Sequence, residues 1–194
     1  MHTKTRVVRR SPAGVTLIEM LIVLTIIGIV AGFAIPRLST AGYRADAAAR
    51  LVRMQMQVAQ RNAITRQSNQ VVNFDLTNNK VIVVQDYNNN DSLDVNDLQT
   101  GRKLPEGTKF ATPTWAGPDG VTHGGSVTGT SLNTFNGLNG VIFRRDGSSS
   151  TDLMIFVTNR DVVKTEYRAI WLTQTTGKTD MFKWNGSTWI RMNQ

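Results

Sequence analysis

The sequence contains no cysteine and only two histidines, and these absences exclude several kinds of chemistry. Without cysteine the chain has no disulfide framework, no thiolate metal site and no thiol nucleophile. His123 is the only imidazole after the first few residues, and Glu106 and Glu166 are the only glutamates after residue 35. None of the three lies in a recognisable catalytic motif, so we expect this protein not to be an enzyme.

The excess of positive over negative charge is also small over most of the chain. The formal net charge is +8, but Lys4, Arg6, Arg9 and Arg10 lie within the first fourteen residues, which contain no acid, so the remainder carries only +4. Basicity of the whole chain is therefore weak evidence for nucleic-acid binding. The 194 residues provide for one folded head of ordinary size with an N-terminal extension.

A long apolar run dominates that extension. Residues 15–35 are apolar except for Glu19 and two threonines. At about 1.5 Å per residue the run reaches roughly 31 Å, which matches the hydrocarbon core of a bilayer. Because basic residues precede it, we expect a single transmembrane pass with the N-terminus in the cytoplasm. A cleaved secretory signal, a twin-arginine signal at Arg9 and Arg10, and a plain anchor are alternative interpretations.

Glu19 needs an explanation of its own, because it lies inside the apolar run. A carboxylate in a membrane span costs about 2.5 to 3.5 kcal/mol on insertion scales, so it should have a partner or a task. The side chains around Glu19 are apolar or hydroxylic, and we expect no local partner. An α-amino group created by cleavage after Gly14, on the same or a neighbouring subunit, would supply the missing positive charge.

Residues 14–19, Gly-Val-Thr-Leu-Ile-Glu, resemble the class III signal of type IV pilins and type II secretion pseudopilins. That signal has a short basic leader, a glycine at the cut and a glutamate fifth after it. The resemblance implies that a prepilin peptidase cleaves between Gly14 and Val15 and methylates the new amine of Val15, although the family more often has phenylalanine there. Gly28 and Pro36 stand where the family usually has a helix-loosening glycine and proline.

The same resemblance implies where the protein works and with which partners. The precursor would sit in the bacterial inner membrane, in contact with the lipid bilayer, with its head in the periplasm. An inner-membrane assembly platform would then add it to a filament of other pilins or pseudopilins. In that filament Glu19 would attract the amine of the adjoining subunit.

Beyond the apolar run the sequence predicts an α+β head. Three- and four-residue spacings indicate an amphipathic helix over residues 37–68 that continues the transmembrane helix, with Asp46 as its only acid. Its buried stripe is expected to contain Leu51, Met54, Val58, Ala59, Ala63 and Ile64. We therefore divide the chain into a leader (1–14), a transmembrane or filament-core helix (15–36), the amphipathic helix (37–68) and a β head (69–194).

From residue 69 the period changes to two, which predicts an antiparallel sheet or sandwich packed on the helix. A turn at Asn78 and Asn79 separates the first two strands, and Asn185 followed by Gly186 predicts a type I′ hairpin. Strands are expected at residues 72–76, 81–84, 102–104, 108–111, 140–144, 153–157, 167–172 and 181–184. Between residues 117 and 140, seven glycines predict a long mobile connection or a loop displayed to a partner.

The order of one long helix and then a β head is similar to the GspH/FimT branch of the pilin superfamily. Residues 59–64 at the helix end, residues 141–147 at a strand and turn, and residues 176–178 before the last hairpin carry this softer similarity. It implies a minor pilin or minor pseudopilin.

One loop has the ligand spacing of a calcium site. The first, third, fifth, seventh, ninth and twelfth places of an EF-hand-like loop are occupied by Asp86, Asn88, Asn90, Ser92, Asp94 and Asp97. Against this, Asp91 stands where the sharp turn favours glycine, and Asp97 is shorter than the usual glutamate. An acidic turn without metal is the alternative, so calcium is the only cofactor that the sequence suggests.

DNA capture is the second functional hypothesis, since some FimT-like minor pilins bind DNA for uptake. The cations available for a patch on the head are Lys164, Arg168, Lys178, Lys183 and Arg191. Residues 177–180, Gly-Lys-Thr-Asp, depart from the basic signature of those proteins. A membrane-anchored exported enzyme is a remote third possibility. The leading hypothesis is a minor pilin or pseudopilin of a type IV pilus or a type II secretion system.

Overall fold

The chain divides into two units, Met1–Ser39 and Thr40–Gln194. The computed structural model describes residues 14–34, 41–91, 94, 97–129, 132–135 and 138–192. In the first unit, helix α1 spans the eighteen residues Leu17–Ala34. Within the described ranges, no helix combines the length and the apolar character that a membrane crossing requires. The predicted kink at Pro36 lies outside the described residues.

Helix α2, Ala41–Arg66, is the central helix of the head. Its fully buried side chains recur at three- and four-residue intervals and are mostly alanine: Ala45, Ala48, Ala49, Val52, Met56, Ala59 and Ala63. Because these side chains are small, the helix backbone comes close to the sheets that cover it. The helix ends at Arg66, and Gln67 takes the left-handed conformation (φ 52°) that commonly stops a helix.

The buried stripe predicted from the sequence is only partly correct. Ala59 and Ala63 are buried as expected, but Met54, Val58 and Ile64 are 52%, 43% and 44% exposed. The reason is steric: the face that packs between two sheets is the one with the smallest side chains, whereas the prediction favoured the largest apolar ones. The amphipathic helix itself is confirmed: α2 ends two residues earlier than predicted, and its predicted first residues, 37–40, lie outside the described residues.

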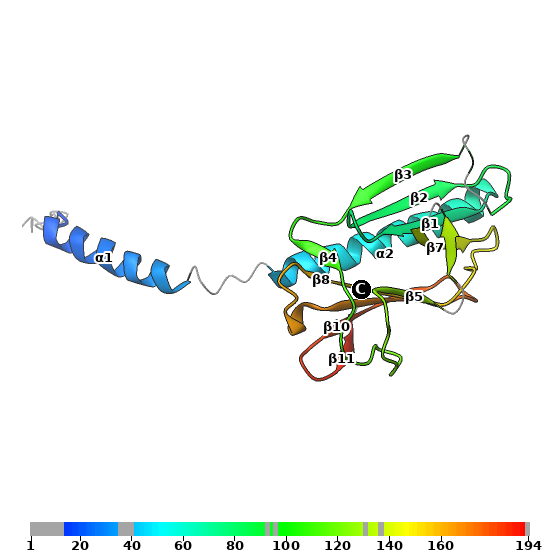
Figure 1. Ribbon diagram of the computed structural model, residues 1–194. Coiled ribbons are helices and arrows are strands. Elements are labelled where there is room, and N and C mark those ends of the chain that lie inside the picture. The colour runs from blue at the N-terminus through cyan, green and yellow to red at the C-terminus, as the bar shows by residue number, and fades with distance from the viewer. Residues whose placement is uncertain are drawn as a thin grey trace, which may run out of the picture. The chain divides into compact units, whose positions relative to one another are not determined.

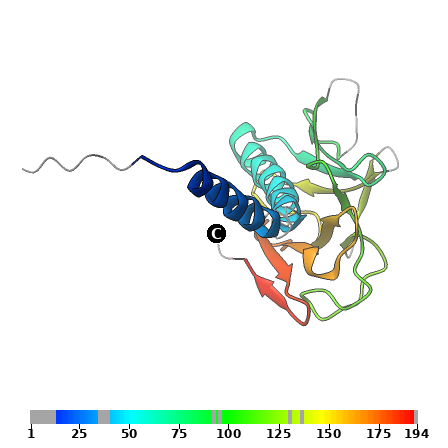
Figure 2. The same ribbon diagram turned by 90° about the vertical axis from the view of Figure 1, so that its left-hand side faces the viewer.

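Two antiparallel sheets cover α2, as Figures 1 and 2 show. The first has the order β3-β2-β1-β7-β6 among the described strands. Its strands are β1 (Gln70–Asp75), β2 (Lys80–Gln85), β3 (Leu98–Lys103), β6 (Asn133–Phe135) and β7 (Leu138–Phe143). Every pairing in it is antiparallel, which confirms the predicted sheet type.

The second sheet has the order β11-β10-β9-β8-β4, and β5 also pairs with β8. Its strands are β4 (Thr108–Phe110), β5 (Val127–Gly129), β8 (Leu153–Asn159), β9 (Arg168–Leu172), β10 (Thr179–Trp184) and β11 (Trp189–Arg191). A short 3-10 helix, η2 (Lys164–Glu166), connects β8 to β9. The inner faces of both sheets and the alanine face of α2 share the main hydrophobic core.

Three features of the sheets differ from the prediction. Strand β3 begins at Leu98, four residues early, and because all six of its residues are exposed they carry no alternating pattern. The glycine-rich stretch contains β5 and β6, which form by pairing with longer strands. The hairpin between β10 and β11 exists, but residues 185–188 connect it and only Gly186 (φ 107°) is left-handed, so it is not a type I′ turn.

The turn between β1 and β2 forms as the sequence predicts. Asn79 is left-handed (φ 50°), and the backbone and side-chain nitrogens of Asn78 donate to the carboxylate of Asp75. The side-chain bond from Asn78 is the main cause that holds the pKa of Asp75 below its ordinary value.

The three segments that carry the GspH/FimT-like similarity meet at one junction in the head. The side-chain amide of Gln60 donates to the carbonyl oxygens of Gly147, at 2.8 Å, and Thr176, at 2.9 Å. Gly177 is left-handed (φ 61°), and a Cβ on it would lie 2.2 Å from the carbonyl oxygen of Gly147. Only glycine therefore fits at position 177 without moving the neighbouring turn.

The alanine face of α2 generates a stability prediction. Replacing Ala48 by leucine should lower the free energy of unfolding by about 1 to 3 kcal/mol, because the added atoms have no room between the sheets. The neighbouring Ala47 is exposed, so Ala47→Leu should change it by less than about 0.5 kcal/mol. Urea unfolding of the full chain followed by tryptophan fluorescence measures both, and equal effects of the two variants would contradict this packing.

Candidate functional site

The predicted processing site lies just before helix α1. Residues 14–16 are not helical, and Gly14 has no other described atoms within 4 Å of the position a Cβ would occupy. Val15 is 64% exposed. A bond between Gly14 and Val15 that lies outside the helix is open to a peptidase, because its backbone groups are not held in helical hydrogen bonds.

Thr16 caps the start of α1, a role that the sequence analysis missed. The backbone N–H of Glu19 donates to the hydroxyl of Thr16 at 3.2 Å and to its carbonyl oxygen at 3.1 Å. Thr16 and Glu19 have the spacing of a capping box, a signal that was readable from the sequence. The backbone N–H of Glu19 is therefore satisfied by Thr16, whereas the expectation from the sequence concerned the carboxylate.

The carboxylate of Glu19 is a different matter. It is exposed, and in the described part of the chain it has no ion-pair partner. Its place in the first turn of the helix is worth about 0.3 to 1 kcal/mol through the helix dipole. That gain is smaller than the roughly 2.5 to 3.5 kcal/mol cost of a charge in apolar surroundings. In apolar surroundings, the carboxylate of Glu19 would therefore still need a positively charged partner.

Comparison with known proteins bears on this segment directly. Residues 9–35 match the family model of the prokaryotic N-terminal methylation motif. This methylation motif contains Gly14, Val15, Glu19 and Gly28, and it confirms the resemblance to type IV pilins and pseudopilins that the sequence indicated. No curated protein sequence matches the chain.

Two solved structures similar to this chain are both described as the minor pseudopilin EpsH of the type 2 secretion system of Vibrio cholerae. One has a TM-score of 0.48 and 10% identity and covers 72% of this chain and 97% of its own. The other has a TM-score of 0.46 and 13% identity, with coverage of 71% and 92%.

The EF-hand-like loop follows strand β2 and is braced by its own side chains. Asp86 is fully buried, and its carboxylate accepts from the backbone N–H groups of Asn90, at 3.3 Å, and Asp91, at 2.8 Å. The side-chain amides of Asn88 and Asn90 both donate to Asp94, at 2.7 and 2.9 Å. The loop is therefore already ordered by hydrogen bonds.

Asp91 does not obstruct the turn as the sequence suggested. It takes the left-handed conformation (φ 58°) that the sixth place of such a loop requires. Its carboxylate accepts from the side-chain amide of Asn69 at 2.9 Å and pairs with Arg144 at 3.4 Å. These contacts offset the strain of a non-glycine residue there.

Calcium binding by this loop stays a prediction. Ser92 lies outside the described residues, and no group of three acidic or imidazole side chains within the described ranges is close enough to hold a metal ion. Asp97 accepts from the backbone N–H groups of Asp94 and Tyr87. For calcium to bind, the amides of Asn88 and Asn90 would have to turn their oxygens toward Asp94, because oxygen atoms are the ligands of this ion.

The five cations predicted for DNA contact do not form an open patch. Arg168 is fully buried: its Nε pairs with Asp46, and its Nη1 donates to the carbonyl oxygens of Thr165 and Tyr167, both at 3.0 Å. Its expected role on the surface is therefore wrong, because it fastens the start of α2 to β9. A charge this deeply buried needs a partner, and Asp46 provides it.

The other four cations remain at the surface with mixed surroundings. Lys178 and Arg191 share the carboxylate of Asp180. Lys164 lies 5.8 Å from the ring centre of Trp115, and Lys183 is exposed on β10. Asp180 offsets part of the positive charge of Lys178 and Arg191, and DNA binding by these four cations stays a prediction.

The loop generates the second prediction. Suppose that it binds calcium with a dissociation constant near 10⁻⁴ M. Free calcium at about one hundred times that concentration should then raise the free energy of unfolding by about 2.7 kcal/mol. Thermal unfolding of the full chain in calcium and in chelator measures this, and Asp94→Asn should remove the difference, whereas Asp161→Asn, on an exposed loop, should retain it. The same unfolding temperature in calcium and in chelator would show that the loop is held by its hydrogen bonds alone.

Proposed function

We propose that this chain is a minor pilin or minor pseudopilin that a prepilin peptidase cleaves between Gly14 and Val15 and methylates on the amine of Val15. The observation that carries the proposal is the match of residues 9–35 to the methylation motif, with Gly14 and Glu19 in place. The product is a component of a type IV pilus or of a type II secretion pseudopilus.

The local structure is compatible with this processing. A cut after Gly14 leaves Thr16 in the mature chain, so α1 keeps its N-terminal cap and the helix need not be rebuilt. The new amine lies one residue before the cap. Its ordinary pKa is about 7.7 to 8.0, so it is mostly positive near neutral pH.

The new positive charge and Glu19 need each other. A cation at the N-terminus of a helix is unfavourable, because the helix dipole already places partial positive charge there. The carboxylate of Glu19 has no ion-pair partner in the described residues and lies in an apolar helix. Between subunits of a filament these charges would pair in surroundings where water screens them little.

The apolar side chains of α1 supply the attraction between subunits. Leu17, Ile18 and Leu24 are 85%, 68% and 67% exposed, and they need either lipid or other helices around them. We infer that the bilayer of the inner membrane surrounds them first and neighbouring subunits later, with the head in the periplasm and an inner-membrane assembly platform making the transfer. The hydrophobic contacts would hold the subunits together, and the charge pair would set their axial register.

The proposal predicts that the charge of Glu19, and not its capping geometry, is required for assembly. Glu19→Gln keeps the size and capping spacing of the side chain but removes the charge, and Glu19→Ala removes both. Both variants should enter the membrane normally, yet their share of sheared filaments should fall at least about tenfold relative to the unmutated chain, the effect of roughly 1.4 kcal/mol.

Thr16→Ser, which keeps a capping hydroxyl, serves as the matched control and should incorporate normally. Quantitative immunoblots of membrane and filament fractions from cells that express each variant give the measurement. Normal incorporation of Glu19→Gln would refute the charge pair, and unprocessed precursor in the control would refute the proposed cleavage.

A further inference from the structure

A cavity lies on the outer face of the second sheet, the side that faces away from α2. Strand pairing aligns Thr128 of β5, Met154 of β8 and Trp171 of β9 in one row across the sheet. Their neighbours along the strands, Leu153 and Leu172, belong to the inner core. Because side chains alternate along a strand, the row itself faces outward.

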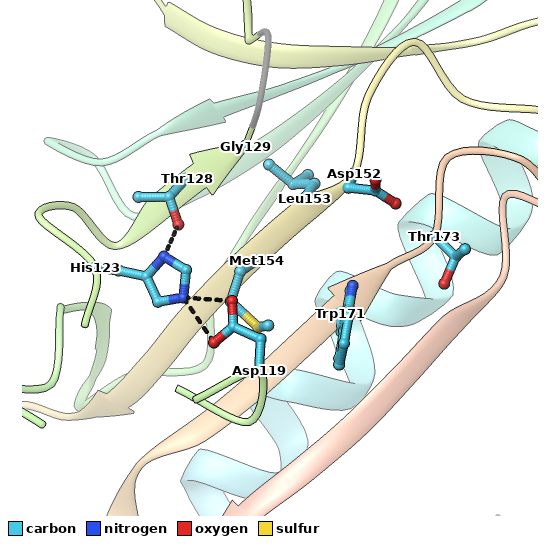
Figure 3. A pocket seen from close by; sticks show the side chains of 9 residues that line it. All are labelled: Asp119, His123, Thr128, Gly129, Asp152, Leu153, Met154, Trp171 and Thr173. Carbon is cyan, nitrogen blue, oxygen red and sulfur yellow. Dashed lines mark hydrogen bonds and ion pairs between the residues drawn. The ribbon is translucent and has the colours of Figure 1, made fainter. Parts of the chain in front are cut away.

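A glycine-rich loop closes one side of this cavity. The backbone N–H of Gly117 donates to the carbonyl oxygen of Val121 at 2.7 Å, and the loop then reaches His123. Nε2 of His123 lies 3.1 Å from both carboxylate oxygens of Asp119, and Nδ1 lies 2.9 Å from the hydroxyl of Thr128 (Figure 3). These contacts fasten the loop to β5.

The contacts of His123 use both of its ring nitrogens. With the proton on Nε2, the imidazole donates to Asp119 and accepts at Nδ1 from the Thr128 hydroxyl. The side chain of Asp119 is 23% exposed. The hydroxyl, imidazole and carboxylate have the order found in some hydrolases, but here all three are used to fix the loop.

The cavity has a volume of about 400 Å³, within the range of small-molecule sites. Its described lining includes the carboxylates of Asp119 and Asp152, the side chains of Met154 and Trp171, and no lysine or arginine. In the view of Figure 3, Asp119 and Met154 lie to one side of the Trp171 indole and Asp152 lies above it. A chain with a formal net charge of +8 thus presents two acids around a half-buried indole.

We propose that this cavity binds the guanidinium or ammonium group of an arginine or lysine side chain on a partner protein. Such a cation is attracted to the face of an indole and to carboxylates, and its methylene stem packs on apolar surface such as Met154. Asp152 accepts one bond, from the backbone N–H of Gln174 at 2.8 Å, and has no ion-pair partner in the described residues. An anion would be repelled by the two carboxylates, and a neutral sugar would leave the charge of Asp152 without an ion-pair partner.

Each of the four tryptophans carries one indole N–H, which allows the site to be observed in the full chain. The protein is labelled with ¹⁵N-tryptophan and held in detergent micelles, and Trp171→Phe identifies the signal of Trp171. Nα-acetyl-arginine methylamide is the probe, and the uncharged citrulline analogue is its matched control. We expect a saturable shift of the Trp171 signal with the arginine probe and none with the citrulline analogue.

Two variants test whether the shift of the Trp171 signal depends on the carboxylate of Asp152. Asp152→Asn should weaken binding of the arginine probe about threefold, the size expected for one partly exposed charge pair. Asp161→Asn, at the opposite end of β8, should leave it unchanged. No saturable shift, an equal shift with citrulline or a neutral disaccharide, or unchanged affinity in Asp152→Asn would overturn the proposal.

Discussion

The head depends on the close fit of one helix between two sheets. Fully buried alanines bring the backbone of α2 near both β1 and β8, so both sheets share their main core with the helix. The side chains of two residues, Arg168 and Gln60, fix the position of α2 between the sheets. Arg168 pairs with Asp46 near the first turn, and Gln60 joins the turns after β7 and β9 near the last. The helix is therefore held near both ends by polar contacts, and the guanidinium of Arg168 is the most deeply buried of the groups involved.

Helix α1 follows a different constraint, because its residues are apolar except for Glu19 and Thr25. Burial of side chains such as Leu17 and Ile18 is worth about 1.5 to 3 kcal/mol each, so a helix of this kind gains much from any apolar surrounding. An unpaired Glu19 carboxylate in the same surroundings would be unfavourable. The proposed pairing of Glu19 with the amine of a neighbouring subunit would add one directed contact to this undirected hydrophobic attraction.

The sequence predicted the parts of the fold that depend on period. Alternation located β1, apolar runs located β2 and β8, and three- and four-residue spacing located α2. Prediction from the sequence failed where a strand forms only because another strand pairs with it. Strand β3 is exposed throughout and β5 has three residues, so both depend on the strand beside them. The buried face of α2 was misjudged because steric fit selected alanine over Met54 and Val58.

The candidate sites show the same division. Gly14 and Glu19 were readable because their signal lies within six residues, and so was the capping residue Thr16, although it was overlooked. Arg168 was misplaced because its partner, Asp46, is 122 residues away. The sequence made Asp91 look unfavourable because the sixth place of such a loop favours glycine, but Asn69, just before β1, and Arg144, just after β7, stabilise its left-handed conformation.

Mass spectrometry of the protein isolated from its native membrane or filament tests the central claim most directly. The account predicts a mature chain that begins at Val15 and carries one additional methyl group on its α-amine. An uncut N-terminus, or a first residue beyond the apolar run of residues 15–35, would contradict it.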